Sequence, residues 1–154
     1  MNKHLAQLNI ARAKYENDDP RFAGFIDNLD RVNAVADRSK GFVWRLQEDD
    51  GEKTISATDD PQLLVNLSVW ENAEDLERFV FNTIHKRVYE KRKEWFPPLR
   101  EAHFVMWWIP AGHIPTVDEA FERLQRLRTD GPTDDAFGWE RLENLKLWMT
   151  KQCA

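Results

Sequence analysis

The sequence has almost no cysteine: its single cysteine, Cys153, is next to the last of the 154 residues. This excludes an internal disulfide and a cysteine metal cluster, and it fits a reducing cytoplasm. The chain also lacks any run of 18 apolar residues, and its first residues, MNKHLAQLNIAR, lack the apolar segment of a signal peptide. We therefore expect a soluble cytoplasmic protein that does not enter a membrane.

An excess of positive charge is missing as well. The 22 Lys and Arg residues are outnumbered by 27 Asp and Glu residues, and the net charge at pH 7 is −5. A nucleic-acid surface needs a basic face that replaces the counterions of phosphate, so no nucleic-acid partner is expected. Glycine-rich phosphate loops and a nucleophile elbow are also absent from the sequence. His4, His103 and His113 have no metal-ligating spacing, so we expect no metal site.

Aromatic residues, by contrast, are plentiful. The chain has seven Trp and nine Phe, and 42% of its residues are hydrophobic. A single domain of this length can bury a real core. Aromatic side chains at this density enlarge a core, build an interface or enclose a flat apolar ligand.

The stretch from Leu63 to Phe96 predicts a buried strand followed by a long helix. Residues 63–70 alternate in polarity at their centre, so that Asn66, Ser68 and Trp70 share one face of a strand. From Leu76 the apolar residues recur at spacings of three and four, which is typical of a helix. Beside this core-facing stripe runs a second one, at i, i+4 and i+8, which indicates either a pocket or a subunit interface. Its members are Phe81, His85 and Tyr89.

The same patterns predict the other elements. Strands are expected at 3–10, 42–46 and 103–109, and an amphipathic helix at 22–38. Phe42, Trp44 and Leu46 should share one strand face. Thr116 and Glu119 have the capping-box spacing, so a helix should begin there and end at Gly131. A short strand at 54–57 and a last helix within 133–154 complete the prediction.

This order of elements predicts an α+β fold, a ferredoxin-like βαββαβ domain with a C-terminal helix. We expect residues 1–132 to form the domain, and residues 133–154 to be an extension that packs on the domain or on a dimer partner. The helices should cover one face of the antiparallel sheet. The opposite face also needs cover, which a second copy of the chain would supply in a homodimer.

Three motifs, NLSVWE, FVFNTIH and WWIPAGHIPTVDEA, carry a family resemblance. From Leu5 to about Phe137 the chain resembles the bacterial family of domains of unknown function called DUF3291. The resemblance implies membership of the dimeric α+β barrel superfamily, which includes antibiotic-biosynthesis monooxygenases, cofactor-independent oxygenases and heme-degrading enzymes. It therefore implies the same fold and a homodimer, whereas fold alone does not carry an activity.

The heme-degrading members also offer a comparison for individual residues. They use an asparagine on the first strand, and a tryptophan and a histidine on the helix after the third strand. Asn9 and His85 correspond to two of these, but Phe79 stands at the tryptophan position. The spacing from Trp70 to His85 is also shorter, so the chain departs from the heme-binding pattern. We expect no cofactor, with heme bound by His85 as an alternative.

The candidate site residues follow from these patterns. His85 can act as a base, an acid or a ligand, or it can simply be a histidine hydrogen-bonded within the core. Asn9, Asn66 and Ser68 either form the polar wall of a pocket between sheet and helices, or bond to one another on the dimer-facing side. The expected catalytic residues are His85 and Asn9. The expected substrate-binding residues are Trp44, Asn66, Ser68, Trp70, Phe81, Tyr89, Trp95 and Trp107.

Three functions are compatible with these residues. The first is a small-molecule-binding protein that resembles cofactor-independent monooxygenases and holds a small aromatic ligand. In such an enzyme His85 would remove a proton from a phenol or enol, and the carbanion would react with dioxygen. The second is a non-catalytic dimeric module whose aromatic residues serve packing and partner binding. The third is a heme-binding protein.

Overall fold

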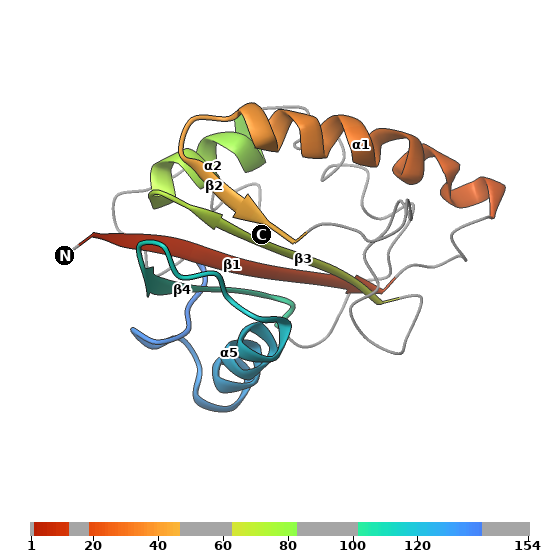
Figure 1. Cartoon of the computed structure of the whole chain (residues 1–154). Helices are drawn as coiled ribbons and strands as arrows, with labels where there is room; N and C mark the ends of the chain where they lie inside the picture. Colours follow the sequence, from red (N-terminus) through yellow and green to blue (C-terminus); the bar gives the residue numbers. More distant parts are fainter. Residues whose placement is uncertain (1, 13–18, 47–62, 83–101, 140–154) are drawn as a thin grey trace.

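The computed structural model describes residues 2–12, 19–46, 63–82 and 102–139 (Figure 1). Within these ranges the chain forms four strands, three α-helices and one short 3-10 helix. In chain order they are β1 (Lys3–Arg12), η1 (Pro20–Phe22), α1 (Ala23–Arg38), β2 (Phe42–Arg45), β3 (Leu63–Trp70), α2 (Ala73–Asn82), β4 (Phe104–Pro110) and α5 (Val117–Asp130). The described elements therefore follow the expected order. The predicted strand at 54–57, the helix beyond Asn82 and the last helix lie outside the described residues.

The four strands form one antiparallel sheet in the order β2-β3-β1-β4. The central strand β1 pairs with β3 on one side and with β4 on the other, so that Leu8 lies opposite both Leu67 and Val105. Two strand-helix-strand units in this order make the ferredoxin-like arrangement. The predicted α+β fold is confirmed.

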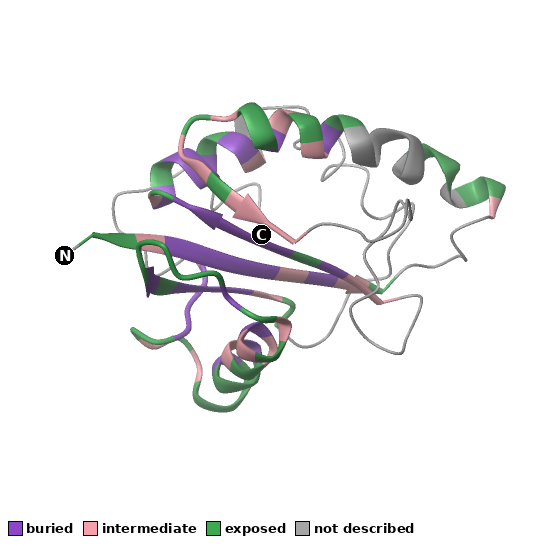
Figure 2. Ribbon diagram, viewed as in Figure 1, coloured by how far each residue is buried: buried purple, intermediate pink, exposed green. Residues whose placement is uncertain are grey.

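Each face of the sheet is covered by helices (Figure 1). On one face, Leu5 and Trp70 pack with Val32 of α1 and Leu76 of α2. We call this the helix-facing side because both crossover helices lie on it. On the other face, Leu8 and its neighbours in the sheet pack against α5. Figure 2 shows β1 buried through its middle, between these two layers.

The position of α5 differs from the expectation that the helices cover only one face. Ala120, Leu124 and Leu127 of α5 are buried against the sheet on the face opposite α1 and α2. Their spacing of four and three residues gives α5 a narrow apolar stripe, which it buries by packing across β4 and β1. The chain therefore covers with its own helix a part of the sheet that we had assigned to a partner.

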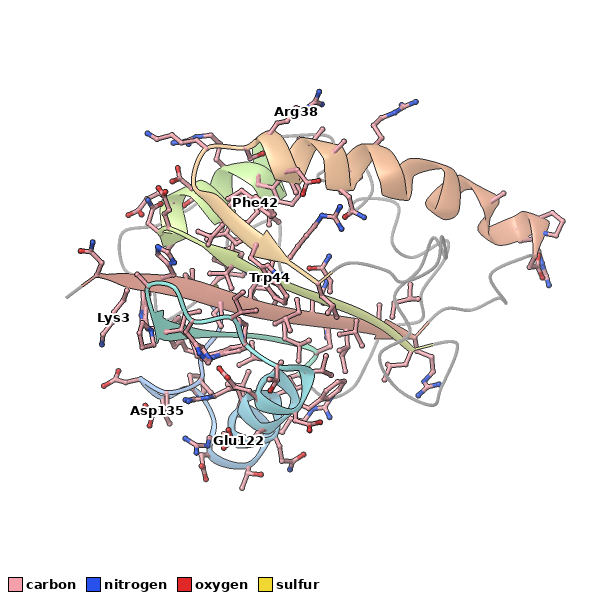
Figure 3. All side chains as sticks on the ribbon, in the orientation of Figure 1. Lys3, Arg38, Phe42, Trp44, Glu122 and Asp135 are labelled. Atoms are coloured by element: carbon pink, nitrogen blue, oxygen red, sulfur yellow. The ribbon has the colours of Figure 1, made fainter. Side chains whose placement is uncertain are left out.

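A bulge in β2 changes the faces of its side chains. Phe42 lies opposite Trp70 and Trp44 lies opposite Val69, so Val43 is an extra residue between them. Phe42, labelled with Trp44 in Figure 3, packs on the helix-facing side. Trp44 and Leu46 pack on the side of α5. The prediction that Phe42, Trp44 and Leu46 share a face is therefore wrong at Phe42.

After α5 the chain returns to the outer edge of β4. Met106 and Phe137 exchange two backbone hydrogen bonds, of 2.7 and 3.0 Å, and Phe137 is buried. Phe137 is thus paired with the outer edge of the sheet. Residues 140–154 lie outside the described residues.

None of the helices in the described ranges has the length and apolar character that a membrane crossing requires.

Candidate ligand-binding site

A row of polar side chains lies on the helix-facing side of β1 and β3. Alternation along each strand places Gln7 and Asn9 on the same face of β1, and Asn66 and Ser68 on the same face of β3. The antiparallel register sets Gln7 opposite Ser68 and Asn9 opposite Asn66. Four polar residues from two distant parts of the sequence are therefore neighbours on a face that is otherwise largely apolar.

The inner part of this row is a buried hydrogen-bonded chain. The Gln7 amide Nε2 donates to Ser68 Oγ at 2.6 Å and to Asn66 Oδ1 at 2.7 Å. The indole Nε1 of Trp70 donates to the same Ser68 Oγ at 3.0 Å. Gln7 is 5% exposed and Ser68 is 7% exposed, so these bonds replace the water that both groups lose. Gln7, which holds the row together, is a residue that the sequence analysis missed.

The outer part of the row retains unused hydrogen-bonding groups. Asn66 is exposed and accepts a hydrogen bond through Oδ1, and its Nδ2 has no partner in the described part of the chain. Asn9 is half-buried, and its side-chain amide makes no hydrogen bond to any described residue. Both asparagines therefore have amide groups that can bond to water or to a ligand, and this makes the Asn9–Asn66 pair a candidate for ligand contact.

The positive charge of Arg45, next to the polar row, is paired with the carboxylate of Asp37. Arg45 of β2 lies opposite Ser68, and its guanidinium donates to the carboxylate of Asp37 on α1, with Nε–Oδ1 at 2.8 Å and Nη2–Oδ2 at 3.3 Å. This two-point geometry suits a guanidinium and a carboxylate. It joins β2 to α1 and leaves the row without a net charge from this pair.

Stacked aromatic rings lie on both sides of the polar row. Asn9 is opposite Phe104 of β4, and the Phe104 ring stacks on Trp139 with centroids 5.4 Å apart and an interplanar angle of 16°. On the α2 side, Trp70 stacks on Phe79 at 5.2 Å and meets Phe42 edge-on at 5.6 Å. Phe104 and Trp139 were also missed by the sequence analysis, because the return of residues 132–139 to β4 was not foreseen.

The structure brings together only some of the predicted site residues. Asn9, Asn66, Ser68 and Trp70 are neighbours on the helix-facing side. Trp44 and Trp107 lie on the opposite side, in the layer with α5, and they are therefore not part of the same surface. The side chain of Phe81 and the residues His85, Tyr89 and Trp95 lie outside the described part of the chain.

A second polar cluster holds α5 to the far side of the sheet. Trp107, which is fully buried, donates through Nε1 to Glu119 Oε2 at 3.0 Å, and His113 Nε2 lies 2.8 Å from Glu119 Oε1. Burial favours a higher pKa for Glu119. The hydrogen bonds with His113 and Trp107 and the charges of His113 and Arg123 outweigh it, so the pKa lies below its ordinary value of 4.5.

In the described ranges, no three His, Cys, Asp or Glu side chains are grouped so that they could hold a metal ion. The hydrogen bonds of Trp107 and His113 with Glu119 attach the first turn of α5 to the sheet.

The chain belongs to the family described as "Domain of unknown function (DUF3291)", whose sequence profile matches residues 4–153. The resemblance of the motifs is thereby confirmed over nearly the whole chain. No curated protein matches the chain in sequence.

Five solved chains match this chain in structure, and the following three are among them. SnoaB, a cofactor-independent oxygenase from Streptomyces nogalater, is 13% identical, with 74% of this chain and 97% of that chain covered and a TM-score of 0.47. NE2512 from Nitrosomonas europaea, a protein of unknown function, is 14% identical, with coverages of 74% and 96% and a TM-score of 0.48. PA3566 from Pseudomonas aeruginosa is 14% identical, with coverages of 71% and 94% and a TM-score of 0.46.

Proposed function

We propose that this protein binds a small, flat organic molecule on the helix-facing side of its sheet. The ligand would contact the Asn9–Asn66 pair and lie near the stacked rings of Phe104 and Trp139. The observation that carries the proposal is the pair of asparagines whose amides have unused hydrogen-bonding groups, next to a buried polar chain and an aromatic stack.

Physical chemistry supports this assignment. Small-molecule sites combine apolar and aromatic surface with a few fixed polar groups that orient the ligand. Here the fixed polar groups are Asn66, which Gln7 holds in place, and Asn9, which lies opposite it. Aromatic rings prefer offset stacking or edge contacts with other rings, so a flat ligand suits the surface near Phe104.

We propose His85 as the proton acceptor for this ligand, in the manner of a cofactor-independent monooxygenase. A neutral imidazole can take a proton from a phenol or an enol. The resulting carbanion reacts with dioxygen, and the peroxide anion takes the proton back from the imidazolium to give a hydroperoxide. Loss of water then leaves one oxygen atom on the substrate as a carbonyl and the other in water.

Ligand screening of matched variants tests the proposal. Wild-type protein, Asn66→Ala, His85→Ala and the control Gln125→Ala would be titrated with a library of flat aromatic compounds by calorimetry. Gln125 is exposed on α5, on the other side of the sheet. We expect ligands whose affinity falls about fivefold to tenfold in Asn66→Ala and is unchanged in Gln125→Ala.

The outcomes separate the candidate functions. If no compound binds to wild type, the small-molecule function is refuted, and a non-catalytic dimeric module becomes the better description. If His85→Ala binds the same ligands and consumes dioxygen with them as fast as wild type, His85 is not the base.

We also propose that two copies of the chain associate through the side of the sheet that carries α5. Trp44, Leu46 and Leu63 are half-buried there, on β2 and β3, whereas α5 packs on β1 and β4. A second copy would cover these apolar side chains. Light scattering coupled to size exclusion should give the mass of a dimer for wild type and a smaller mass for Trp44→Glu. A wild-type monomer at micromolar concentration would refute the dimer.

A further inference from the structure

We infer that the ligand of this site is uncharged, and that it presents a hydrogen-bond donor beside an acceptor on one planar edge, as a cyclic amide does. The inference rests on the proposed function and names the class of ligand. It follows from counting which hydrogen-bonding groups of the polar row are already used.

The buried hydrogen bonds fix the orientation of the row. A glutamine amide has two N–H donors, and Gln7 uses its Nε2 for Ser68 and for Asn66. Because Oδ1 of Asn66 accepts from Gln7, the Nδ2 of Asn66 is the group that remains for a ligand. Rotating the Asn66 amide would bring two N–H groups face to face and lose the bond to Gln7. Asn66 therefore offers a donor.

Asn9 supplies the complementary group. Its amide has both a carbonyl and an N–H2, and neither has a partner among the described residues. Directly opposite residues in an antiparallel pair have their Cβ atoms about 4.5–5.5 Å apart. The amides of Asn9 and Asn66 can therefore reach adjacent atoms of one ligand edge, with Asn66 donating to a carbonyl and Asn9 accepting from a neighbouring N–H or O–H.

The charges around the row disfavour an ionised ligand. The guanidinium in this part of the sheet, Arg45, is already paired with Asp37 through two hydrogen bonds, so it does not offer an unpaired positive charge to a carboxylate or a phosphate. The other members of the row carry only amide and hydroxyl dipoles. Asn9 is half-buried, and neither it nor Asn66 carries a charge that would offset the loss of water from an ion, so a neutral group is placed there at a lower cost in free energy.

Three flat bicyclic probes of similar size test the inference. Isoquinolone carries a cyclic amide edge, naphthalene has no polar group, and naphthoate carries a carboxylate. Each would be titrated by calorimetry into wild type, Asn66→Asp, Asn9→Ala and the control Gln125→Ala. The aspartate keeps the oxygen that accepts from Gln7 and replaces the outward N–H2 with a charged oxygen.

We expect wild type to bind isoquinolone at least about tenfold more tightly than naphthoate, because naphthoate finds no opposite charge. Asn66→Asp should weaken isoquinolone about tenfold and Asn9→Ala about fivefold, with naphthalene affected less than twofold in both. Gln125→Ala should match wild type for all three probes. Circular dichroism of each variant confirms that it is folded.

The two possible failures are distinguishable. If naphthalene and naphthoate bind at least as tightly as isoquinolone, the inference about the ligand class is overturned while the proposed binding site stands. If none of the three probes binds to wild type, the proposed function itself fails. Equal losses for isoquinolone and naphthalene in Asn66→Asp also overturn the inference, because a general change of the site would then explain them.

Discussion

Replacement of Gly41 by alanine should destabilise the protein much more than the same change at Gly112. Both glycines have positive φ, +83° at Gly41 and +94° at Gly112, a conformation that costs a side-chain-bearing residue about 1–2 kcal/mol. A Cβ at Gly112 would meet nothing within 4 Å, whereas a Cβ at Gly41 would lie 2.6 Å from the Cβ and Cγ of Asp75. The difference between the two variants isolates this overlap.

Asp75 cannot easily move away from Gly41. Its side chain is 3% exposed, its Oδ1 accepts from Arg78 at 2.9 Å, and its backbone N–H donates to the N-cap Asn72 at 2.8 Å. The Gly41 carbonyl in turn accepts from the N–H of Glu71 at 2.7 Å. Overlaps in such well-packed places cost about 1–3 kcal/mol. We therefore expect a loss of about 1 kcal/mol for Gly112→Ala and about 2–4 kcal/mol for Gly41→Ala.

Urea unfolding followed by tryptophan fluorescence gives both values, and the slope of the transition should be the same in all variants. An extra loss of about 2 kcal/mol should lower the melting temperature by about 4–8 °C relative to Gly112→Ala. With Asp75→Gly as the background, Gly41→Ala should lose most of this extra cost, because glycine at position 75 removes both the Cβ and the Cγ that overlap. If Gly41→Ala costs no more than Gly112→Ala, the close approach of Asp75 is not a constraint on this turn.

Further predictions concern the buried polar groups. The lowered pKa of Glu119 means that its carboxylate contributes stability above pH 4.5, and that this contribution is lost as the pH falls through the lowered pKa. The difference in unfolding free energy between wild type and Glu119→Gln should therefore shrink from pH 6 to pH 3, and a constant difference would contradict the assignment. Ser68→Ala should cost about 1–3 kcal/mol, because it leaves two buried N–H donors short of an acceptor; a loss below about 0.5 kcal/mol in urea unfolding would show that they find other partners. Thr116→Ala should cost about 1 kcal/mol, because α5 loses its N-cap hydrogen bond to Glu119; hydrogen exchange should quicken first in the first turn of α5, and uniform exchange would argue against a local effect.

The fold could be predicted because periodicity is written into the sequence. Alternation at the centre of residues 63–70 predicted β3, and Thr116 and Gly131 marked both ends of α5. The bulge at Val43 could not be predicted, because an extra residue in β2 is recognised only from its register with the partner strand β3.

The candidate site was less predictable, because a polar row is made by the register between strands. Asn66 and Ser68 were identified as polar residues within a strand, but the face they share with α1 and α2 had to come from the structure. The role of Gln7 could not be predicted, because a single glutamine in a strand belongs to no motif or spacing that indicates a function. Its role becomes apparent only when Ser68 lies opposite it.

The pairing of Phe137 with Met106 protects the protein against aggregation through the edge of its sheet. β4 is the last strand on its side of the sheet, and an outermost strand offers unpaired backbone groups to any other extended chain. The segment that follows α5 pairs with the middle of that strand, so these backbone groups are no longer open to another chain. Truncation before Thr133 would expose this edge strand, and we expect the truncated chain to aggregate under conditions in which the full chain does not.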